Sequence, residues 1–421
     1  MRIQRVHARQ ILDSRGNPTL EVDLLTNNAL GTASVPSGAS TGVHEAIELR
    51  DGGVSYRGKN VSKAVKNVNK TINEALKGST VDEQKELDSK LNALDGTKEK
   101  KKLGSNAILG VSMAATRASA SENKLHLFEY ISALHNVKKY VLPVPFANII
   151  NGGVHAGNKL QFQEIMIAPI HAKSFSEATR IIVEIYQELK DIIALEYSKQ
   201  STSVGDEGGF SPNIQTVEEG LDLIKKAAWA TGYTKKIAFA IDAAASEFYV
   251  KEQNKYEVMP GKFFTKKELI QYYVDLTKKY NIISIEDPFH EDDYDSFKEL
   301  TLKIGDHVQI VGDDLTVSNP NRINYCASLK ACNALLLKIN QIGTISEALE
   351  AADIAENNDW KIMVSHRSGE TDDSYIADLA VGIGCGQIKL GAPARGERTA
   401  KYNQLLRIEE YLGRDGSYAR W

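Results

Sequence analysis

The spacing of apolar residues changes along the chain from an alternating pattern to a helical one. Residues 20–24 alternate apolar with polar side chains, and a second extended stretch at 33–35 follows the turn signal Asn27-Asn28. This pattern predicts a small antiparallel sheet. Apolar residues then recur every three or four positions from 61 to 76, and an alanine-rich segment runs from Ser105, its expected cap, to residue 119. These segments predict helices, so the first part of the chain is expected to be α+β.

Two prolines, Pro143 and Pro145, interrupt the helical pattern. They predict an N-terminal domain of residues 1–136 and a second domain of residues 137–421. In the second domain short β-prone runs alternate with longer helix-like segments, which favours a parallel sheet. The runs are 237–241, 282–285, 308–311, 334–337, 362–364 and 387–388, and the helix-like segments include 176–195, 217–230, 266–280 and 345–357.

A polar residue follows each of these β-prone runs. In chain order these residues are Asp242, Glu286, Asp313, Lys338, His366 and Lys389. Successive members are separated by roughly the length of a strand and a helix, an arrangement typical of a (β/α) barrel whose reactive groups meet at the C-terminal rim. A doubly wound open sheet shares the alternation, but a closed ring better explains why six strands would deliver polar groups to one place.

Three of these residues, Asp242, Glu286 and Asp313, are carboxylates on successive strands. Carboxylates gathered in a partly desolvated cleft repel one another, so together they predict a bound cation, although each one alone could be a solvated loop acid. Oxygen ligands without a nearby histidine or cysteine pair favour Mg²⁺. The run His290–Asp293 lies beyond its strand and is expected to be a solvated group of charges.

Lys338 interrupts an apolar run and is a candidate base. Burial and the positive charges of Lys389 and of a divalent ion are expected to lower its pKa. The alternative is a lysine that only extends to solvent at a strand end. Next to His366, Arg367 and Ser368 are suited to bind a phosphate, although from local sequence alone Arg367 could equally pair with Glu370 or Asp372.

Three loops are rich in glycine and other small residues. Residues 36–42 lack the lysine of a P-loop and are interpreted as a mobile lid. Residues 151–157 carry His155, and residues 205–209 carry Asp206 and Glu207. Each loop alone is a weak signal for a site.

Composition narrows the class of protein. The 421 residues carry a net charge of −4 and are 42% hydrophobic, which is typical of a globular protein without a basic nucleic-acid footprint. The start of the chain lacks the apolar core of a secretion signal and no stretch is apolar enough to span a membrane, so a cytoplasmic protein is expected. The three cysteines have no disulfide or zinc spacing and are expected to be core residues.

Blocks of sequence along nearly the whole chain resemble the enolase family. They are Leu12-Asp-Ser-Arg-Gly-Asn-Pro-Thr19, Ser37-Gly-Ala-Ser-Thr-Gly42, Gly205-Asp-Glu-Gly-Gly209, Ser284-Ile-Glu-Asp-Pro-Phe289, Gly312-Asp-Asp-Leu315, Leu335-Leu-Leu-Lys-Ile-Asn-Gln-Ile-Gly-Thr-Ile-Ser-Glu347 and Ser365-His-Arg-Ser-Gly-Glu370. The resemblance implies an α/β fold: an N-terminal α+β domain and a C-terminal modified (β/α)8 barrel of the ββαα(βα)6 type. It also implies the reversible dehydration of 2-phosphoglycerate to phosphoenolpyruvate in glycolysis and gluconeogenesis.

The resemblance further implies a role for each candidate residue. Two Mg²⁺ ions are expected, one held by Asp242, Glu286 and Asp313, and a second that arrives with substrate and binds Ser40. Lys338 is implied as the base, and Glu207, with Glu164 beside it, as the acid. The substrate-binding residues implied are His155, Gln163, Glu164, Glu286, Asp313, Lys338, His366, Arg367, Ser368 and Lys389.

Departures from the family pattern are few, and alternatives to the hydratase remain. Leu390 follows Lys389 where a small residue is common, and Ile165 follows Glu164 where phenylalanine is usual. A racemase or acid-sugar dehydratase of the same superfamily would share the barrel and the metal carboxylates. A binding or scaffold protein, at the cell surface or in an RNA-processing assembly, is the alternative from another class. The resemblance suggests a homodimer or an octamer built of dimers.

Overall fold

Three antiparallel strands form the N-terminal sheet in the computed structural model, which describes residues 1–39 and 42–421. They are β1 (Arg5–Leu12), β2 (Pro18–Leu25) and β3 (Leu30–Ser34), in that order across the sheet. Alternation along β2 buries Leu20, Val22 and Leu24 completely on the face covered by a long helix, as the sequence predicts.

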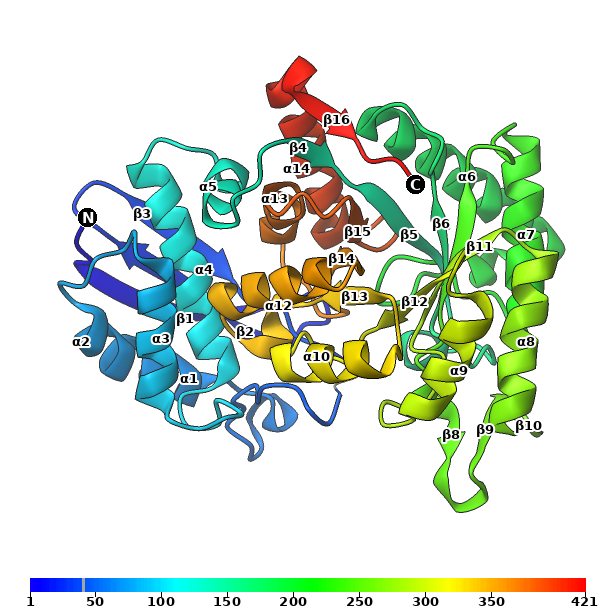
Figure 1. The fold of residues 1–421 in the computed structure, drawn as a ribbon, viewed down its shortest axis with the longest axis horizontal. Coiled ribbons are helices and arrows are strands. Elements are labelled where there is room, and N and C mark those ends of the chain that lie inside the picture. The colour runs from blue at the N-terminus through cyan, green and yellow to red at the C-terminus, as the bar shows by residue number, and fades with distance from the viewer. Residues whose placement is uncertain (40–41) are drawn as a thin grey trace.

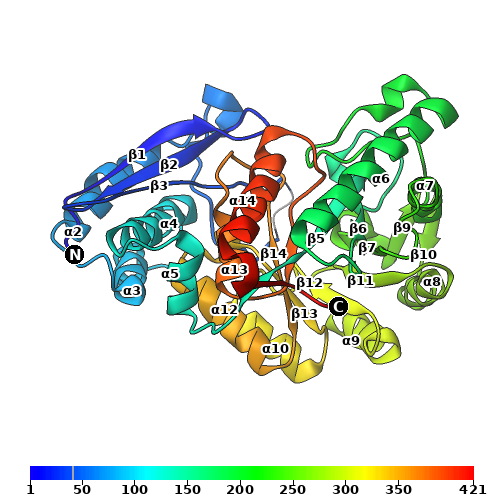
Figure 2. The same ribbon diagram turned by 90° about the horizontal axis from the view of Figure 1, so that it is seen from above.

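Helices cover this sheet on one side (Figures 1 and 2). They are α1 (Ser62–Asn67), a π-helical turn (Val68–Ile72), α2 (Asn73–Leu76), α3 (Gln84–Asp95), α4 (Ser105–Glu122) and α5 (Leu127–Leu134), after a short 3₁₀ turn (Ser55–Gly58). The prediction that Ser105 caps α4 is wrong. Gly104 occupies the cap position with φ of 99°, a conformation that favours glycine, and Ser105 is the first helical residue.

Eight strands close into a barrel. In order around the ring they are β11 (Ile282–Glu286), β12 (Gln309–Gly312), β13 (Ala334–Leu337), β14 (Lys361–Ser365), β15 (Gln387–Lys389), β5 (Val144–Asn151), β6 (Glu164–Ala168) and β7 (Ala238–Asp242). All neighbours are parallel except that β6 runs antiparallel to both β5 and β7. The closed ring excludes the open doubly wound sheet and confirms the modified barrel.

The barrel helices lie outside the ring. In Figure 1, α6, α7 and α8 lie on the side away from the N-terminal sheet, whereas α12 and α13 lie next to the N-terminal helices. They are α6 (Phe175–Glu196), α7 (Val217–Ala230), α8 (Lys266–Lys279), α9 (Tyr294–Ile304), α10 (Pro320–Leu329), α11 (Ile339–Ile342), α12 (Ile345–Asn357), α13 (Tyr375–Gly382) and α14 (Gly396–Leu412). Short elements complete the chain: β8 (Tyr249–Val250), β9 (Lys255–Met259) and β10 (Lys262–Phe264) form a side sheet, and β4 (Tyr140–Leu142) pairs with β16 (Gly416–Tyr418).

Local chemistry explains several of these helix boundaries. The side chains of Thr216 and Thr265 each accept a hydrogen bond from the backbone N–H three residues later. The residue there is a glutamate, whose side chain accepts from the backbone N–H of the threonine, so both sites are capping boxes. Among the described residues, no helix combines the length and apolar character that crossing a bilayer requires.

The barrel interior is apolar along most of its length. Val144, Phe146, Met166, Leu336 and Met363 belong to a separate core cluster inside the ring. At the N-terminal end of the strands the Trp421 ring packs on Phe146, with the ring centroids 5.8 Å apart. Because all strands but β6 are parallel, the polar groups that follow them gather at the other rim.

Candidate active site

Most strands of the barrel bring ionisable side chains to one rim of the ring. Asp242 ends β7, Glu286 ends β11 and Asp313 directly follows β12, so the three predicted carboxylates lie on adjacent strands. Glu164 is the first residue of β6, and because β6 is antiparallel its first residue lies at the same rim as the last residues of its neighbours. Lys389 ends β15 and Lys338 follows β13.

Lys389 reaches across this rim to three buried carboxylates. Its Nζ donates to Asp242 Oδ2 at 3.0 Å and to both Glu286 oxygens at 2.9 Å, and it lies 3.0 Å from Glu164 Oε1. Burial lowers the pKa of Lys389, but these carboxylates outweigh burial and hold the pKa well above its usual range. Lys389 is therefore a fixed positive charge at the centre of the site.

Lys338 forms a hydrogen-bonded ion pair with Asp313. Gln341, in α11, donates from Nε2 to the other Asp313 oxygen at 2.8 Å. Burial lowers the pKa of Lys338, but the charge of Asp313 outweighs it and the pKa is raised. The expected lowering of the pKa depends on a divalent ion next to the amine as well as on Lys389, so it stays a prediction for the metal-bound protein.

The residues at this rim fit a divalent cation. Burial and the charges of Asp242 and Asp313 raise the pKa of Glu286 well above its usual range, which shows that the three carboxylates repel one another. Glu164 Oε2 and Gln163 Oε1 are buried oxygens that have no hydrogen-bond partner in the described part of the chain. An oxygen donor set around concentrated negative charge is the type that Mg²⁺ prefers. The other predicted ligand, Ser40, lies outside the described residues.

Glu207 lies between two imidazole rings. Its Oε1 is 3.5 Å from His155 Nδ1 and 3.7 Å from His366 Nε2, and its Oε2 accepts a 2.8 Å hydrogen bond from Asn148 Nδ2. Burial raises its pKa, whereas the positive charges of Lys389 and Arg398 lower it. Burial and the neighbouring charge of Glu207 raise the pKa of Glu164 well above its usual range.

The resemblance implies Glu207 as the acid, and this assignment stays a prediction. The ligand atoms of His155, Glu164 and Glu207 all lie within 4.8 Å of one another, so the two carboxyls act as one group with one proton to share. The raised pKa of Glu164 favours that carboxyl as the one that carries the shared proton. Sequence analysis could not decide between them, because most of the charges that act on the two carboxyls come from other elements of the fold.

Arg367 pairs with a residue that is far away in the sequence. Its Nη1 and Nη2 donate to the two Glu45 oxygens at 3.0 and 3.1 Å. Glu370 instead accepts from the Arg367 backbone N–H and pairs with Lys401 at 2.9 Å, so the local alternatives Glu370 and Asp372 are wrong. Ser368 Oγ accepts from the Ala39 backbone N–H at 2.7 Å, which places it beside the predicted lid.

A single small pocket collects most of the predicted substrate-binding residues. It is lined by His155, Gln163, Glu164, Glu207, Lys338, Ser365, His366, Arg367, Ser368 and Lys389. Glu286 and Asp313 do not line it and instead contact the two lysines that do. Gln163 Nε2 donates to Asp242 Oδ2 at 3.1 Å, so the pocket and the carboxylate cluster are directly connected.

Sequence analysis missed three residues that organise this pocket, namely Asn148, Glu45 and Arg398. Asn148 interrupts the apolar run of β5, and Arg398 shares one buried helix face with Tyr402 and Leu405. A polar or charged residue on an otherwise apolar strand or stripe is a signal that could have identified both. Glu45 carries no comparable signal, because its pairing with Arg367 joins residues that are far apart in the sequence.

The run His290–Asp293 is only partly exposed, which corrects the expectation of a solvated group. Glu291 and Asp293 are buried. Glu291 Oε2 accepts from the Val43 backbone N–H at 3.2 Å, and Asp293 caps α9. These acids therefore hold the end of the lid segment and the start of a helix. Cys326 and Cys332 are buried as expected, and Cys385 is half-buried.

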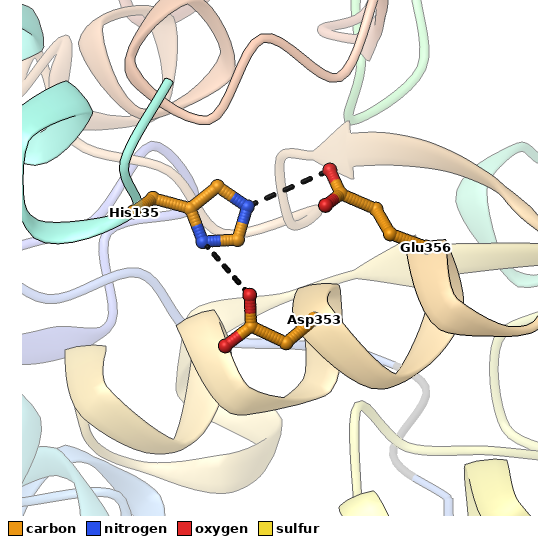
Figure 3. A group of neighbouring side chains, drawn as sticks. All are labelled: His135, Asp353 and Glu356. Atoms are coloured by element: carbon orange, nitrogen blue, oxygen red, sulfur yellow. Dashed lines mark ion pairs between the residues drawn. The ribbon is translucent and has the colours of Figure 1, made fainter. Parts of the chain in front are cut away.

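A second group of metal-ligand types lies away from the pocket, at the end of α5 (Figure 3). His135 Nδ1 is 3.3 Å from Asp353 Oδ1, and His135 Nε2 is 3.5 Å from Glu356 Oε1 on the same helix, α12. One metal ion can bind only one of the two nitrogens of a given imidazole ring, whereas here each nitrogen of His135 faces a different carboxylate. The group is therefore best described as an ion-pair link between the chain after α5 and α12.

Two family models match the chain. The model described as "Enolase, N-terminal domain" matches residues 3–131, and the model described as "Enolase, C-terminal TIM barrel domain" matches residues 139–420. Together they cover nearly the whole chain, and they correspond to the α+β part and the barrel that the structure displays.

Proposed function

We propose how the rim residues divide the reaction of this chain, which belongs to the enolase family and is a phosphopyruvate hydratase. This lyase interconverts 2-phosphoglycerate with phosphoenolpyruvate and water in glycolysis. Lys338 removes the C2 proton, and the Glu164–Glu207 pair protonates the departing hydroxyl. Arg367 and Ser368 bind the phosphate. The substrate pocket is completed by His155, Gln163, His366 and Lys389. The proposal also places the boundary between the two domains between residues 136 and 137.

One observation carries this division of roles. Glu164 is on β6 and Lys338 follows β13, and these two strands are four places apart in either direction around the eight-stranded ring. The acid pair and the base therefore face each other across the pocket. A substrate between them can lose a proton on one side and a hydroxyl on the other.

The C2 proton is difficult to remove because it lies next to a carboxylate. Its loss places a second negative charge on that group, so positive charge must be concentrated there. Lys389 is positioned to supply part of it, since its pKa keeps it protonated. The family uses Mg²⁺, which supplies further positive charge at the substrate carboxylate and which Asp242, Glu286 and Asp313 would hold. A second ion held by Ser40 is also part of the proposal.

Lys338 must be unprotonated to act as a base. Its ion pair with Asp313 favours the protonated form, so this contact must be given up before the C2 proton can be taken. The acid pair has the opposite requirement. The raised pKa of Glu164 keeps one proton available beside Glu207 for transfer to the hydroxyl.

The test is to separate proton removal from hydroxyl loss. Lys338→Ala should abolish exchange of the C2 hydrogen of 2-phosphoglycerate with heavy water, whereas Glu207→Gln should keep this exchange and lose formation of phosphoenolpyruvate, followed by its ultraviolet absorbance. Both wild-type activities should disappear on chelation of Mg²⁺ and return when it is added back. Exchange that survives in Lys338→Ala would remove the base assignment, and loss of both activities in Glu207→Gln would remove the division of roles.

Assembly and location belong to the same proposal. Family membership supports a homodimer or an octamer of dimers, and a glycolytic reaction supports a cytoplasmic location. Light scattering on the purified protein would measure the assembly directly. A monomer at micromolar concentration would contradict it.

A further inference from the structure

We propose that Arg398 is a positioning residue that fixes His366 as the tautomer with its proton on Nε2, directed at Glu207. The inference rests on the proposed function, because it gives His366 a defined part in the acid side of the pocket. It concerns a residue that does not line the pocket and that acts only through its neighbours.

Arg398 is completely buried beneath the pocket. It lies in the first turn of α14, and its Nη1 donates to His366 Nδ1 at 2.7 Å and to the Arg367 carbonyl at 2.6 Å. Its Nη2 donates to the carbonyls of Ser368, at 2.7 Å, and Asp206, at 3.1 Å. One guanidinium thus binds the phosphate-binding turn and the loop that carries Glu207.

The tautomer follows from the chemistry of the donor. A guanidinium has only N–H donors and does not lose its proton in proteins, so His366 Nδ1 must accept the bond with its lone pair. A neutral imidazole then carries its proton on Nε2. Burial lowers the pKa of His366 well below its usual range and Arg398 adds to this effect, which keeps the ring neutral.

Nε2 faces the acid pair. It lies 3.7 Å from Glu207 Oε1 and has no hydrogen-bond partner among the described residues, although it is buried. An N–H held in this direction can donate to Glu207 or to a substrate oxygen next to it. In the reverse tautomer the Nε2 lone pair would face the Glu207 carboxylate. The Nδ1–H would also face the Arg398 N–H donor, so the contacts of both ring nitrogens would be unfavourable.

The chain leaves room for this contact at Gly391, which directly precedes the loop to α14. A Cβ at this position would lie 2.7 Å from the Glu207 carbonyl, 2.9 Å from Arg398 Cδ and 3.2 Å from His366 Cε1. Only a residue without a side chain allows the arginine, the imidazole and the Glu207 loop to approach this closely. The contact between Arg398 and His366 therefore requires glycine at position 391 and does not depend on side-chain packing alone.

The first experiment uses the unmodified protein. Full-length chain labelled with ¹⁵N at histidine is examined by long-range proton–nitrogen NMR between about pH 6 and 8, the range in which a free histidine titrates. The His366 signals are assigned by their loss in His366→Gln. We expect an unprotonated Nδ1 and a protonated Nε2 throughout. A protonated Nδ1, or a titrating ring, would overturn the proposal.

The second experiment replaces the donor. Arg398→Lys keeps a positive charge but cannot hold all of the contacts, and Arg407→Lys, an exposed position on the same helix, is its matched control. We expect Arg398→Lys to lower kcat for dehydration by about 10- to 100-fold, the range typical for residues that orient a catalytic group, with a smaller change in KM and a mixture of His366 tautomers. C2 exchange, assigned to Lys338, should fall much less.

The outcomes separate this proposal from the one on which it rests. A rate that falls while His366 keeps a single Nε2–H tautomer would show a purely structural role for Arg398 and overturn the inference. A rate equal to that of Arg407→Lys would also overturn it. Failure of the proposed function appears elsewhere, as C2 exchange that survives in Lys338→Ala.

Discussion

Lys389 should contribute more to stability than a typical lysine, because its ammonium faces three buried carboxylates. We consider Lys389→Met, which keeps most of the side-chain volume and removes the charge. Nζ is 2.9–3.0 Å from Asp242, Glu286 and Glu164. At an effective dielectric constant of about 20 each such pair contributes about 5 kcal/mol of Coulomb attraction before desolvation is counted. Removing one partner of a buried ion pair destabilises proteins by about 3–5 kcal/mol, which is the loss expected here.

The loss should depend on pH. Burial raises the pKa of Glu164 and of Glu286 while Lys389 opposes the rise, so both pKa values should increase further in the variant. A carboxyl whose pKa is higher in the folded than in the unfolded state destabilises the fold above the folded pKa. This penalty disappears as the pH falls below the unfolded pKa. The variant should therefore be closest to wild type in acid and furthest from it above neutrality.

The assay is urea unfolding followed by circular dichroism, at one protein concentration and with a chelator present, at about pH 5.5 and about pH 8. Lys267→Met, an exposed position on α8, is the matched control. We expect a lower unfolding midpoint for Lys389→Met than for the control, with the larger difference at the higher pH. Equal midpoints for the two variants would refute the electrostatic reasoning. A lower midpoint for Lys389→Met that does not change with pH would also refute it and would indicate lost packing instead.

Two further predictions test other parts of the pocket. Glu45→Gln leaves the buried Arg367 guanidinium without its bidentate carboxylate partner, so the thermal unfolding midpoint without ligand should fall. 2-Phosphoglycerate should raise this midpoint more in the variant than in wild type, since the phosphate then supplies the missing negative charge. Equal ligand-induced shifts in differential scanning fluorimetry would contradict this. Gly391→Ala should destabilise by more than about 1 kcal/mol, because its φ of 82° and its close neighbours both disfavour a Cβ; an unchanged midpoint of chemical unfolding would show that the loop can adjust.

The sequence predicted regular structure well wherever one face of an element is buried against its neighbours. The strand 334–337 and the helices 217–230 and 345–357 have the predicted bounds, since the period of apolar residues follows directly from the geometry of a strand or a helix. The polar residues at the ends of the strands were also predicted to meet at one rim, because parallel strands of a ring all end on the same side.

Contacts between distant parts of the chain could not be predicted in this way. Arg367 pairs with Glu45, which is 322 residues away, and not with an acid nearby in the sequence. The ion pair of Lys338 with Asp313, which raises the pKa of Lys338, could not be predicted for the same reason. A pKa depends on which charges lie within a few ångströms and on how much water is excluded, and neither is encoded in local sequence.

The sequence by itself determined the kinds of element, their order and the reactive groups that the barrel carries to its rim. Tertiary structure alone decided which carboxyls face one another, which lysine is paired with which acid, and that a buried arginine contacts His366. The physical reason is that periodicity and residue type act within one element. Charge, burial and hydrogen-bond direction are set only when elements from both ends of the chain are packed together.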